Sequence, residues 1–487
     1  MKNTIAFIIM VMVLFTFSLS ACDGRPENGL PDAGTDNGES YVPEETADGD
    51  DYISTLPANN YKGKEFRLII EDAPRHPNVA EEMIGEAVND ALYERDNRIS
   101  DMFDIKFKYI KHGWLSETLK SAVQKSVNAG LDEYDLILAP LANGINVFAP
   151  AGQLVNLKDV PHIDLHSPWW SQSMYYNTQI NNNLYATSGP MALSYYYAPV
   201  SLSVNLRIAA EYDLGNIYKY VLDGTWTLDK FTELLKGVSR DMNGDGIMTV
   251  YDDLFALSLD DLAGQAFFIG AGGTQMEYDG DGIPQFSVAS EKNLNIIAKL
   301  ADIIADKENV FATEILGVAD KTKPFVVGTS LFMGIGISGV IQDCRAMEDD
   351  YGILPFPKWN EKQEKYITYG SPWGPCGIAV PKTNTDLDMT GLLMEAMAYM
   401  SYTNVGPKMS SVTLNAKIAR DEDSVKMLEI IYEDVLFDLI GIYNFGNMGI
   451  MLRDQIIHNK GDGFISKYER NIGAAQKALD TFIESFE

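Results

Sequence analysis

The stretch EFRLIIED, residues 65–72, is a short apolar strand that begins a regular alternation of strands and helices. A long amphipathic helix is predicted over residues 78–103, and the alternating segment DIKFKYI, residues 104–110, predicts a second strand. Another helix over residues 116–130 leads to YDLILAPL, residues 134–141, a third strand. Strands separated by segments of helix length indicate βαβ units and a mostly parallel sheet.

A second α/β region starts near residue 198 and contains a glycine-rich stretch, residues 269–273. Late in the chain, residues 421–441 place their apolar side chains on one face and predict a single amphipathic helix. Ligands of open α/β sheets bind beyond the carboxyl ends of the strands, at the points where strand order reverses. In the first region these ends are Glu71 with Asp72 and residues 140–144.

The segment DMNGDGIMTVYD, residues 241–252, has the oxygen-rich spacing of a calcium-binding loop, with Gly246 at the turn position. A helix is predicted before the loop and an apolar strand after it, so the loop is single, and the ion is expected to brace its domain and not to switch it. A plain Asn-Gly and Asp-Gly turn is the alternative. The predicted ligands are Asp241, Asn243, Asp245, the carbonyl of Ile247, Thr249 and Asp252.

The N-terminus has the features of a secretory signal: Lys2, an apolar core and small residues before Cys22. The order Leu-Ser-Ala-Cys resembles a bacterial lipobox, which implies a signal peptide over residues 1–21 and a diacylated Cys22. Two acyl chains anchor a protein stably; an ordinary secretory signal with an incidental cysteine is the alternative. Residues 22–60 are rich in Gly, Pro, Asp and Glu and predict an unfolded acidic tether.

The composition argues against several classes of protein. A net charge of −31 repels phosphate backbones, so we expect no nucleic-acid partner. The sequence contains no G-x-S-x-G or H-E-x-x-H motif, and its five histidines have no metal-ligand spacing, so we expect no enzyme. The sequence does not exclude a pair of carboxylates that hydrolyses glycosides, because Asp and Glu residues are abundant. Cys344 and Cys376 are expected to be free, buried thiols.

Aromatic residues gather near predicted strand ends and crossovers, outside periodic helix faces. Indole and phenol rings have apolar faces and a polar group, which suits the C–H faces of sugar rings. A single such residue is more often part of a core, but the set favours a carbohydrate ligand. The predicted ligand-binding residues are Asn143, Trp170, Ser188, Tyr196, Gly272 and Trp373.

Several segments together resemble one family: the lipobox, YDLILAP, IDLHSPWW, GTWTLDKF, DMNGDG, MEDDYGILPFPKWNEKQEKY, GIAVPKT and FDLIGIYNFG. They resemble the extracellular solute-binding lipoproteins of bacterial ABC importers, of the family-one, sugar-binding type common in Gram-positive anaerobes. The resemblance covers residues 61–487. It implies a two-lobed, periplasmic-binding-protein-like α/β fold of type II whose lobes close on a ligand by a hinge motion.

By the same resemblance, lobe one comprises residues 61–195 and 376–487, with the C-terminal helices packing partly on lobe two. Lobe two comprises residues 196–375 and contains the calcium loop, and crossovers lie near residues 192–198 and 373–377.

The implied function is that of a monomeric receptor, lipid-anchored on the extracellular face of the membrane. It would bind a mono- or oligosaccharide between its lobes and deliver it to an ABC permease. The alternatives are a surface glycan-degrading enzyme and a binding protein for a non-sugar solute, such as a peptide or a polyamine.

Overall fold

The computed structural model describes residues 51–72, 78–113, 115–280, 282–313, 321–458 and 463–485. The predicted signal peptide, the lipidation site Cys22 and residues 22–50 of the predicted tether lie outside these residues. Residues 51–60, the end of the predicted tether, begin with the helix α1 (Asp51–Thr55), so the prediction of an unfolded segment is wrong for them. The described residues belong to one compact unit. None of their helices combines the length and the apolar character that a membrane crossing requires.

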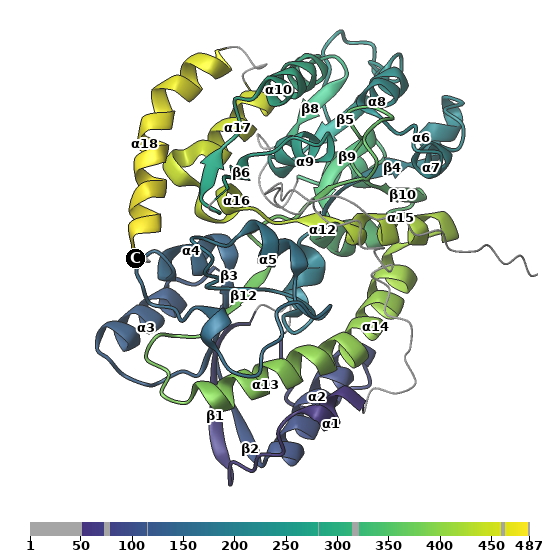
Figure 1. Cartoon of the computed structure of the whole chain (residues 1–487). Helices are drawn as coiled ribbons and strands as arrows, with labels where there is room; N and C mark the ends of the chain where they lie inside the picture. The colour runs from purple at the N-terminus through teal and green to yellow at the C-terminus, as the bar shows by residue number, and fades with distance from the viewer. Residues whose placement is uncertain are drawn as a thin grey trace, which may run out of the picture. The chain divides into compact units, whose positions relative to one another are not determined.

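The first sheet has the strand order β12-β3-β1-β2 (Figure 1). β1 (Lys64–Glu71) pairs in parallel with β2 (Ile105–His112) on one side and with β3 (Leu136–Pro140) on the other. β12 (Cys376–Ala379) is antiparallel to β3. α2 (Ala87–Phe103) and α3 (Glu117–Asn128) connect the parallel strands, so the predicted βαβ alternation is confirmed.

The second sheet has the strand order β10-β4-β9-β5-β8. β5 pairs in parallel with both β8 and β9, whereas β4 is antiparallel to β9 and to β10. Helices α9 (Leu262–Gly270) and α10 (Glu291–Ile304) follow β5 in the chain. The strands are β4 (Val200–Asn205), β5 (Phe255–Leu259), β8 (Val310–Ala312), β9 (Ser330–Gly336) and β10 (Tyr351–Leu354).

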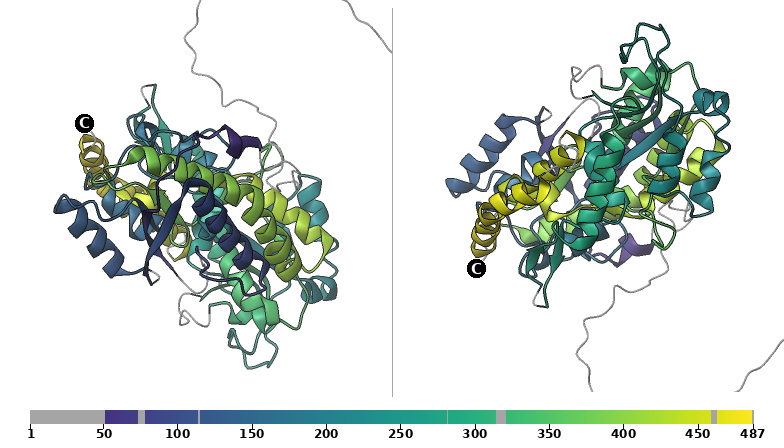
Figure 2. Two further views of the ribbon diagram at one scale, coloured as in Figure 1. Left: turned by 90° about the horizontal axis from the view of Figure 1, so that it is seen from below. Right: turned by 90° about the horizontal axis from the view of Figure 1, so that it is seen from above.

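The remaining elements connect, cover or join the two sheets, and α13 lies beside α2 (Figure 2). The short strands are β6 (Met276–Tyr278), β7 (Pro284–Phe286), β11 (Thr368–Tyr369) and β13 (Val435–Leu436). The helices are α1 (Asp51–Thr55), α4 (Ile145–Phe148), α5 (Gln172–Asn177), α6 (Leu206–Glu211), α7 (Ile217–Leu222), α8 (Leu228–Leu235), α11 (Lys323–Val326), α12 (Ile337–Asp343), α13 (Leu387–Met400), α14 (Gly406–Lys408), α15 (Glu422–Glu433), α16 (Leu439–Tyr443), α17 (Met448–Ile457) and α18 (Phe464–Glu484).

Three chain segments lie side by side between the two sheets. The backbone N–H of Ser371, two residues before the second predicted crossover, donates to the carbonyl of Ala198 in the first at 2.8 Å. β11 also pairs in parallel with β13, which adds a third segment. The prediction of one helix over residues 421–441 is therefore wrong: α15 ends at Glu433, and β13 interrupts the helical pattern.

The C-terminal segment contacts elements of the second sheet. α15 packs against β10 and α7, and α17 packs against α9 and α10. The resemblance implied partial packing of this kind, while the exact lobe boundaries stay a prediction.

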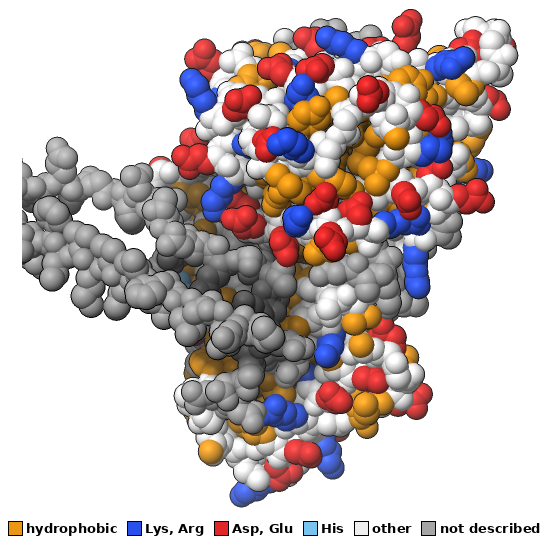
Figure 3. All heavy atoms as spheres, turned by 90° about the vertical axis from the view of Figure 1, so that its right-hand side faces the viewer, with side chains coloured by type: hydrophobic (Ala, Val, Ile, Leu, Met, Phe, Trp, Pro, Cys, Tyr) orange, Lys and Arg blue, Asp and Glu red, His pale blue; other side chains and the backbone are white. Residues whose placement is uncertain are grey.

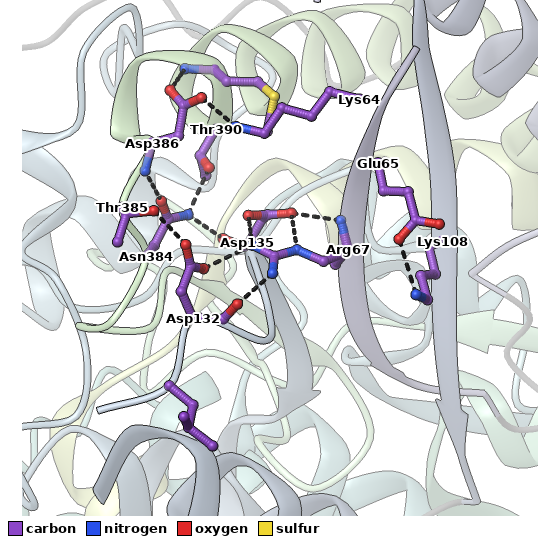
Figure 4. Close-up of polar contacts among 12 residues, drawn as sticks. Lys64, Glu65, Arg67, Lys108, Asp132, Asp135, Asn384, Thr385, Asp386 and Thr390 are labelled. Carbon is purple, nitrogen blue, oxygen red and sulfur yellow. Dashed lines mark hydrogen bonds and ion pairs between the residues drawn. The ribbon is translucent and has the colours of Figure 1, made fainter. Parts of the chain in front are cut away.

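A charged network fixes the start of β1 to its surroundings (Figure 4). The Arg67 guanidinium contacts Asp135 Oδ1 at 2.6 Å and Asp132 Oδ1 at 2.7 Å. Asn384, just before α13, donates to the carbonyl of Asp135 at 3.0 Å. Since the Asp135 side chain is only 1% exposed, this ion pair ties β1, the turn before β3 and the start of α13 together in a buried setting.

The first helix, α1, is held on α13 by a second buried acid. Glu395 of α13 accepts hydrogen bonds from Tyr52 Oη at 2.7 Å, Trp169 Nε1 at 3.1 Å and Trp170 Nε1 at 2.9 Å. The Tyr52 ring also lies 4.7 Å from that of Trp169 and 4.9 Å from that of Tyr399. The three donors compensate the burial of this carboxyl, and Tyr52 docks the start of the folded body.

On the face drawn in Figure 3, basic side chains lie among acidic ones over the described residues. They do not gather into the basic patch that a nucleic-acid partner requires.

Candidate functional site

The switch point of the first sheet lies at the carboxyl end of β1. β2 follows β1 in the chain and lies on one side of it, whereas β3 lies on the other side. β1 ends at Glu71, and β3 is followed by the turn η1 (Leu141–Asn143). Glu71 and Asn143 are therefore at the position where sheets of this kind bind ligands.

Both residues carry polar groups with distinct surroundings. Glu71 is 3% exposed, and burial raises the pKa of its carboxyl to about 7. The nearby Asn78 is 2% exposed and donates from Nδ2 to the backbone carbonyl of Glu71 at 3.1 Å. Asn143 Oδ1 accepts from Lys120 Nζ at 2.9 Å. The end of β1 thus presents a buried acid with a high proton affinity.

The second sheet has its switch point at β5, because β8 and β9 lie on its two sides. β5 is followed by Asp260 and Asp261, which precede α9. Burial, and secondarily the charge of Asp261, raises the pKa of Asp260 to about 7. Asp261 pairs with Lys321 at 3.0 Å and with Arg453 at 3.3 Å. Each sheet therefore places an acid with a raised pKa at its switch point.

The helices α16 and α17 connect the two switch points. α16 contacts the turn η1 after β3, and α17 packs against α9, which starts at the end of β5 (Figure 1). Nearby, Tyr369 Oη donates to Gln265 Oε1 at 3.0 Å, and Gln275 Nε2 donates to Asp438 Oδ2 at 2.7 Å. A series of contacting elements with buried polar side chains thus links the carboxyl ends of both sheets, and we take it as the candidate ligand site.

Three of the residues predicted to bind ligand lie in the core. Trp170 is 1% exposed and bonded to Glu395, and Tyr196 is also 1% exposed. Ser188 is fully buried and donates to the carbonyl of Cys376 at 2.9 Å. None of the three offers a surface to a ligand in this arrangement.

Of the other three predicted residues, two lie at the candidate site and one lies after the end of a helix. Asn143 lies at the first switch point, and Trp373 is 43% exposed in the segment that leads to β12. Gly272 has φ +73° and follows the end of α9, about 13 Å along the helix axis from Asp261. Its glycine is required by the left-handed turn. Asn143 and Trp373 are therefore the predicted residues that fit the candidate site.

The predicted calcium loop is folded around its own amides. Gly246 has φ +79°, and both carboxylate oxygens of Asp241 accept backbone N–H groups, from Gly244 at 2.6 Å and from Gly246 at 2.8 Å. Asn243 and Asp245 each accept from the amide two residues further on. The oxygen donors suit calcium, and the turn alternative also accounts for these bonds.

Asp253, the acid that directly follows the loop, is not among the predicted ligands. Asp253 is fully buried and accepts the amides of Thr249 at 2.6 Å and Met242 at 2.8 Å, whereas Asp252 is exposed. Hydrogen bonds from the Thr249 and Met242 amides lower the pKa of Asp253. The described residues contain no group of three or more His, Cys, Asp or Glu side chains placed to hold a metal ion.

Comparison with known proteins identifies the fold. No family model and no curated protein matches the chain. The ABC substrate-binding protein of Listeria monocytogenes in complex with cycloalternan matches with a TM-score of 0.52 and 12% identity, over 87% of this chain and 99% of that one. UgpB of Mycobacterium tuberculosis in complex with glycerophosphocholine matches with a TM-score of 0.54 and 15% identity, over 84% and 98%. The chain therefore has the two-lobed fold of ABC substrate-binding proteins, as predicted.

Proposed function

We propose that this protein is the solute-binding receptor of an ABC importer and that it binds a carbohydrate between its two lobes. The observation that carries the proposal is the pair of switch points, one in each sheet, with Glu71 and Asn143 at one and Asp260 at the other. α16 and α17 connect them. The fold is shared with two binding proteins, one solved with cycloalternan and one with glycerophosphocholine.

The chemistry of the region suits a ligand that is rich in hydroxyl groups and carries no negative charge. Carboxylate and amide oxygens accept hydrogen bonds from sugar hydroxyls, and the half-exposed Trp373 ring can stack on a sugar face. The lobes close on the ligand by bending of the side-by-side crossing segments and release it unchanged. The negative net charge disfavours an anionic ligand.

The place of action follows from the N-terminal sequence. In this proposal residues 1–21 direct export, Cys22 carries the lipid, and a monomer acts on the extracellular face of a bacterial membrane. The partner is the permease of the importer. We expect no catalytic activity and no nucleic-acid partner.

Calcium is proposed as a structural ion of the loop over residues 241–252. In support, the predicted ligands are side-chain oxygens and the carbonyl oxygen of Ile247, and Gly246 has the backbone conformation that the turn of such a loop requires. The ion would brace lobe two, and it would take no part in binding the sugar.

A thermal-shift screen of residues 51–487 against mono- and oligosaccharides, peptides and polyamines tests the proposal. We expect at least one sugar to raise the melting temperature by several degrees at saturating concentration. If only peptides or polyamines do so, the ligand class is wrong and the receptor fold serves another solute. If a sugar polymer is shortened on incubation, the protein is an enzyme and the proposal fails.

A further inference from the structure

We propose that Glu71 and Asn78 form a subsite for a small hydrogen-bond-donating group of the ligand, an ammonium group in preference to a hydroxyl. The inference rests on the proposed function and specifies the ligand within it: a sugar that carries an amine.

The two side chains present buried acceptor atoms that lack a partner. Glu71 Oε2 and Asn78 Oδ1 have no hydrogen-bond donor among the described residues. The orientation of the Asn78 amide is fixed, because its Nδ2 donates to the Glu71 backbone carbonyl at 3.1 Å. The reverse orientation would place Oδ1 against that carbonyl oxygen, and both atoms are acceptors. Buried acceptors are normally satisfied, and the described residues supply no donor to this pair at the first switch point, so we assign the missing donor to a ligand.

No positive charge of the described residues balances Glu71. On the neighbouring β2, Lys111 Nζ lies 2.6 Å from Glu81 Oε1 and 3.5 Å from Asp72 Oδ2, so its charge is already paired. Burial lowers the pKa of His112 on the same strand and raises that of the Cys376 thiol on β12 to about 12, so both are neutral near pH 7.

Within the described part of the chain, the Glu71 carboxyl also receives a hydrogen bond from the backbone amide of Leu115. An ionised Glu71 is therefore a buried negative charge without a counter-ion among the described residues. An ammonium group supplies both the missing charge and several N–H donors, whereas a hydroxyl supplies one donor and no charge.

The same geometry excludes other ligand groups. A phosphate or carboxylate would face two buried acceptors and a negative field. The subsite thus separates amine-bearing sugars from phosphorylated or acidic sugars.

Titration calorimetry with matched sugar pairs, glucosamine against glucose and galactosamine against galactose, tests the proposal. Three proteins are compared: the natural sequence, Glu71→Gln and the control Asp72→Asn. The control removes one neighbouring negative charge and leaves Glu71 and Asn78 in place. At about pH 7.5 we expect the natural protein to bind the amine member about tenfold more tightly, the gain of one charge-assisted hydrogen bond. Glu71→Gln should abolish this preference, and Asp72→Asn should retain it.

Lowering the pH supplies a second readout that needs no variant. At about pH 5.5 a proton neutralises Glu71, so the preference of the natural protein for the amine should shrink. If both members of each pair bind equally at both pH values, or if Glu71→Gln keeps the preference, the inference is overturned while the proposed function stands. If none of the four sugars binds, the inference is likewise overturned, and the thermal-shift screen decides separately whether the proposed function stands.

Discussion

Replacing Arg67 with Met should destabilise the first lobe strongly, because it leaves Asp135 buried without its charge partner. The Asp135 side chain is 1% exposed and would keep only the Arg67 backbone amide, at 2.7 Å, of the donors that Arg67 now supplies. Breaking a buried ion pair in this way costs about 3–5 kcal/mol. The second partner, Asp132, is 29% exposed, so its loss adds about 0–1 kcal/mol. We expect a total loss of about 3–6 kcal/mol of unfolding free energy.

The assay is urea unfolding followed by tryptophan fluorescence, with ligand binding measured in parallel. A matched control is Lys108→Met, which breaks the pair between Lys108 and Glu65 on the neighbouring strands of the same sheet (Figure 4). Both of its partners are about half exposed, so this variant should lose less than about 1 kcal/mol. A loss as small for Arg67→Met would refute the view that the buried network fixes the start of β1. Asp135→Asn combined with Arg67→Met should recover part of the loss, since no charge then stays buried.

Three further outcomes follow from the site and from the predicted loop. Burial raises the pKa of Glu71 to about 7. The Glu71 carboxyl therefore contributes fully to stability at pH values below its pKa in the unfolded chain, and this contribution is lost as the pH rises through 7. The free energy of unfolding of Glu71→Gln should therefore exceed that of the natural protein by about 1–3 kcal/mol near pH 8 and equal it near pH 4. Urea unfolding at both pH values measures this difference, and an equal difference at both would contradict the prediction. Trp373→Ala should weaken sugar binding about tenfold in titration calorimetry and leave the melting temperature unchanged, since the ring is 43% exposed; unaltered affinity would remove Trp373 from the site. A chelator should lower the melting temperature by several degrees, and calcium should restore it, because an ion bound only to the folded state stabilises it; an Asp241→Ala variant that responds to the chelator as the natural protein does would place the ion elsewhere.

Much of the fold could be predicted because burial imposes periodicity. The stretch around Phe66, Leu68 and Ile70 reads as a strand since these side chains are buried in the sheet, and the helices that follow show their apolar stripes. The C-terminal crossing segment could not be found in this way. β13 has only two residues and lies within a helical pattern, so its pairing with β11 is a tertiary effect without a local signal.

The candidate site was predicted in part for a similar reason. The ends of β1 and β3 mark the first switch point, so Glu71 and Asn143 could be placed from sequence. Whether an aromatic ring near a crossover faces solvent depends on the partner it finds. Trp170 is buried because Glu395, 225 residues away, accepts its N–H, and Trp373 stays exposed. No local pattern encodes a contact at that separation.

The bond between Tyr52 and Glu395 has a mechanical consequence. Because α1 is clamped to α13, the chain that precedes residue 51 enters the body on the lobe that contains the first sheet. In the anchored receptor proposed above, a pull along that chain would act first on this lobe, through the bond between Tyr52 and Glu395. The other lobe would then keep its freedom to move while the protein is held at a surface.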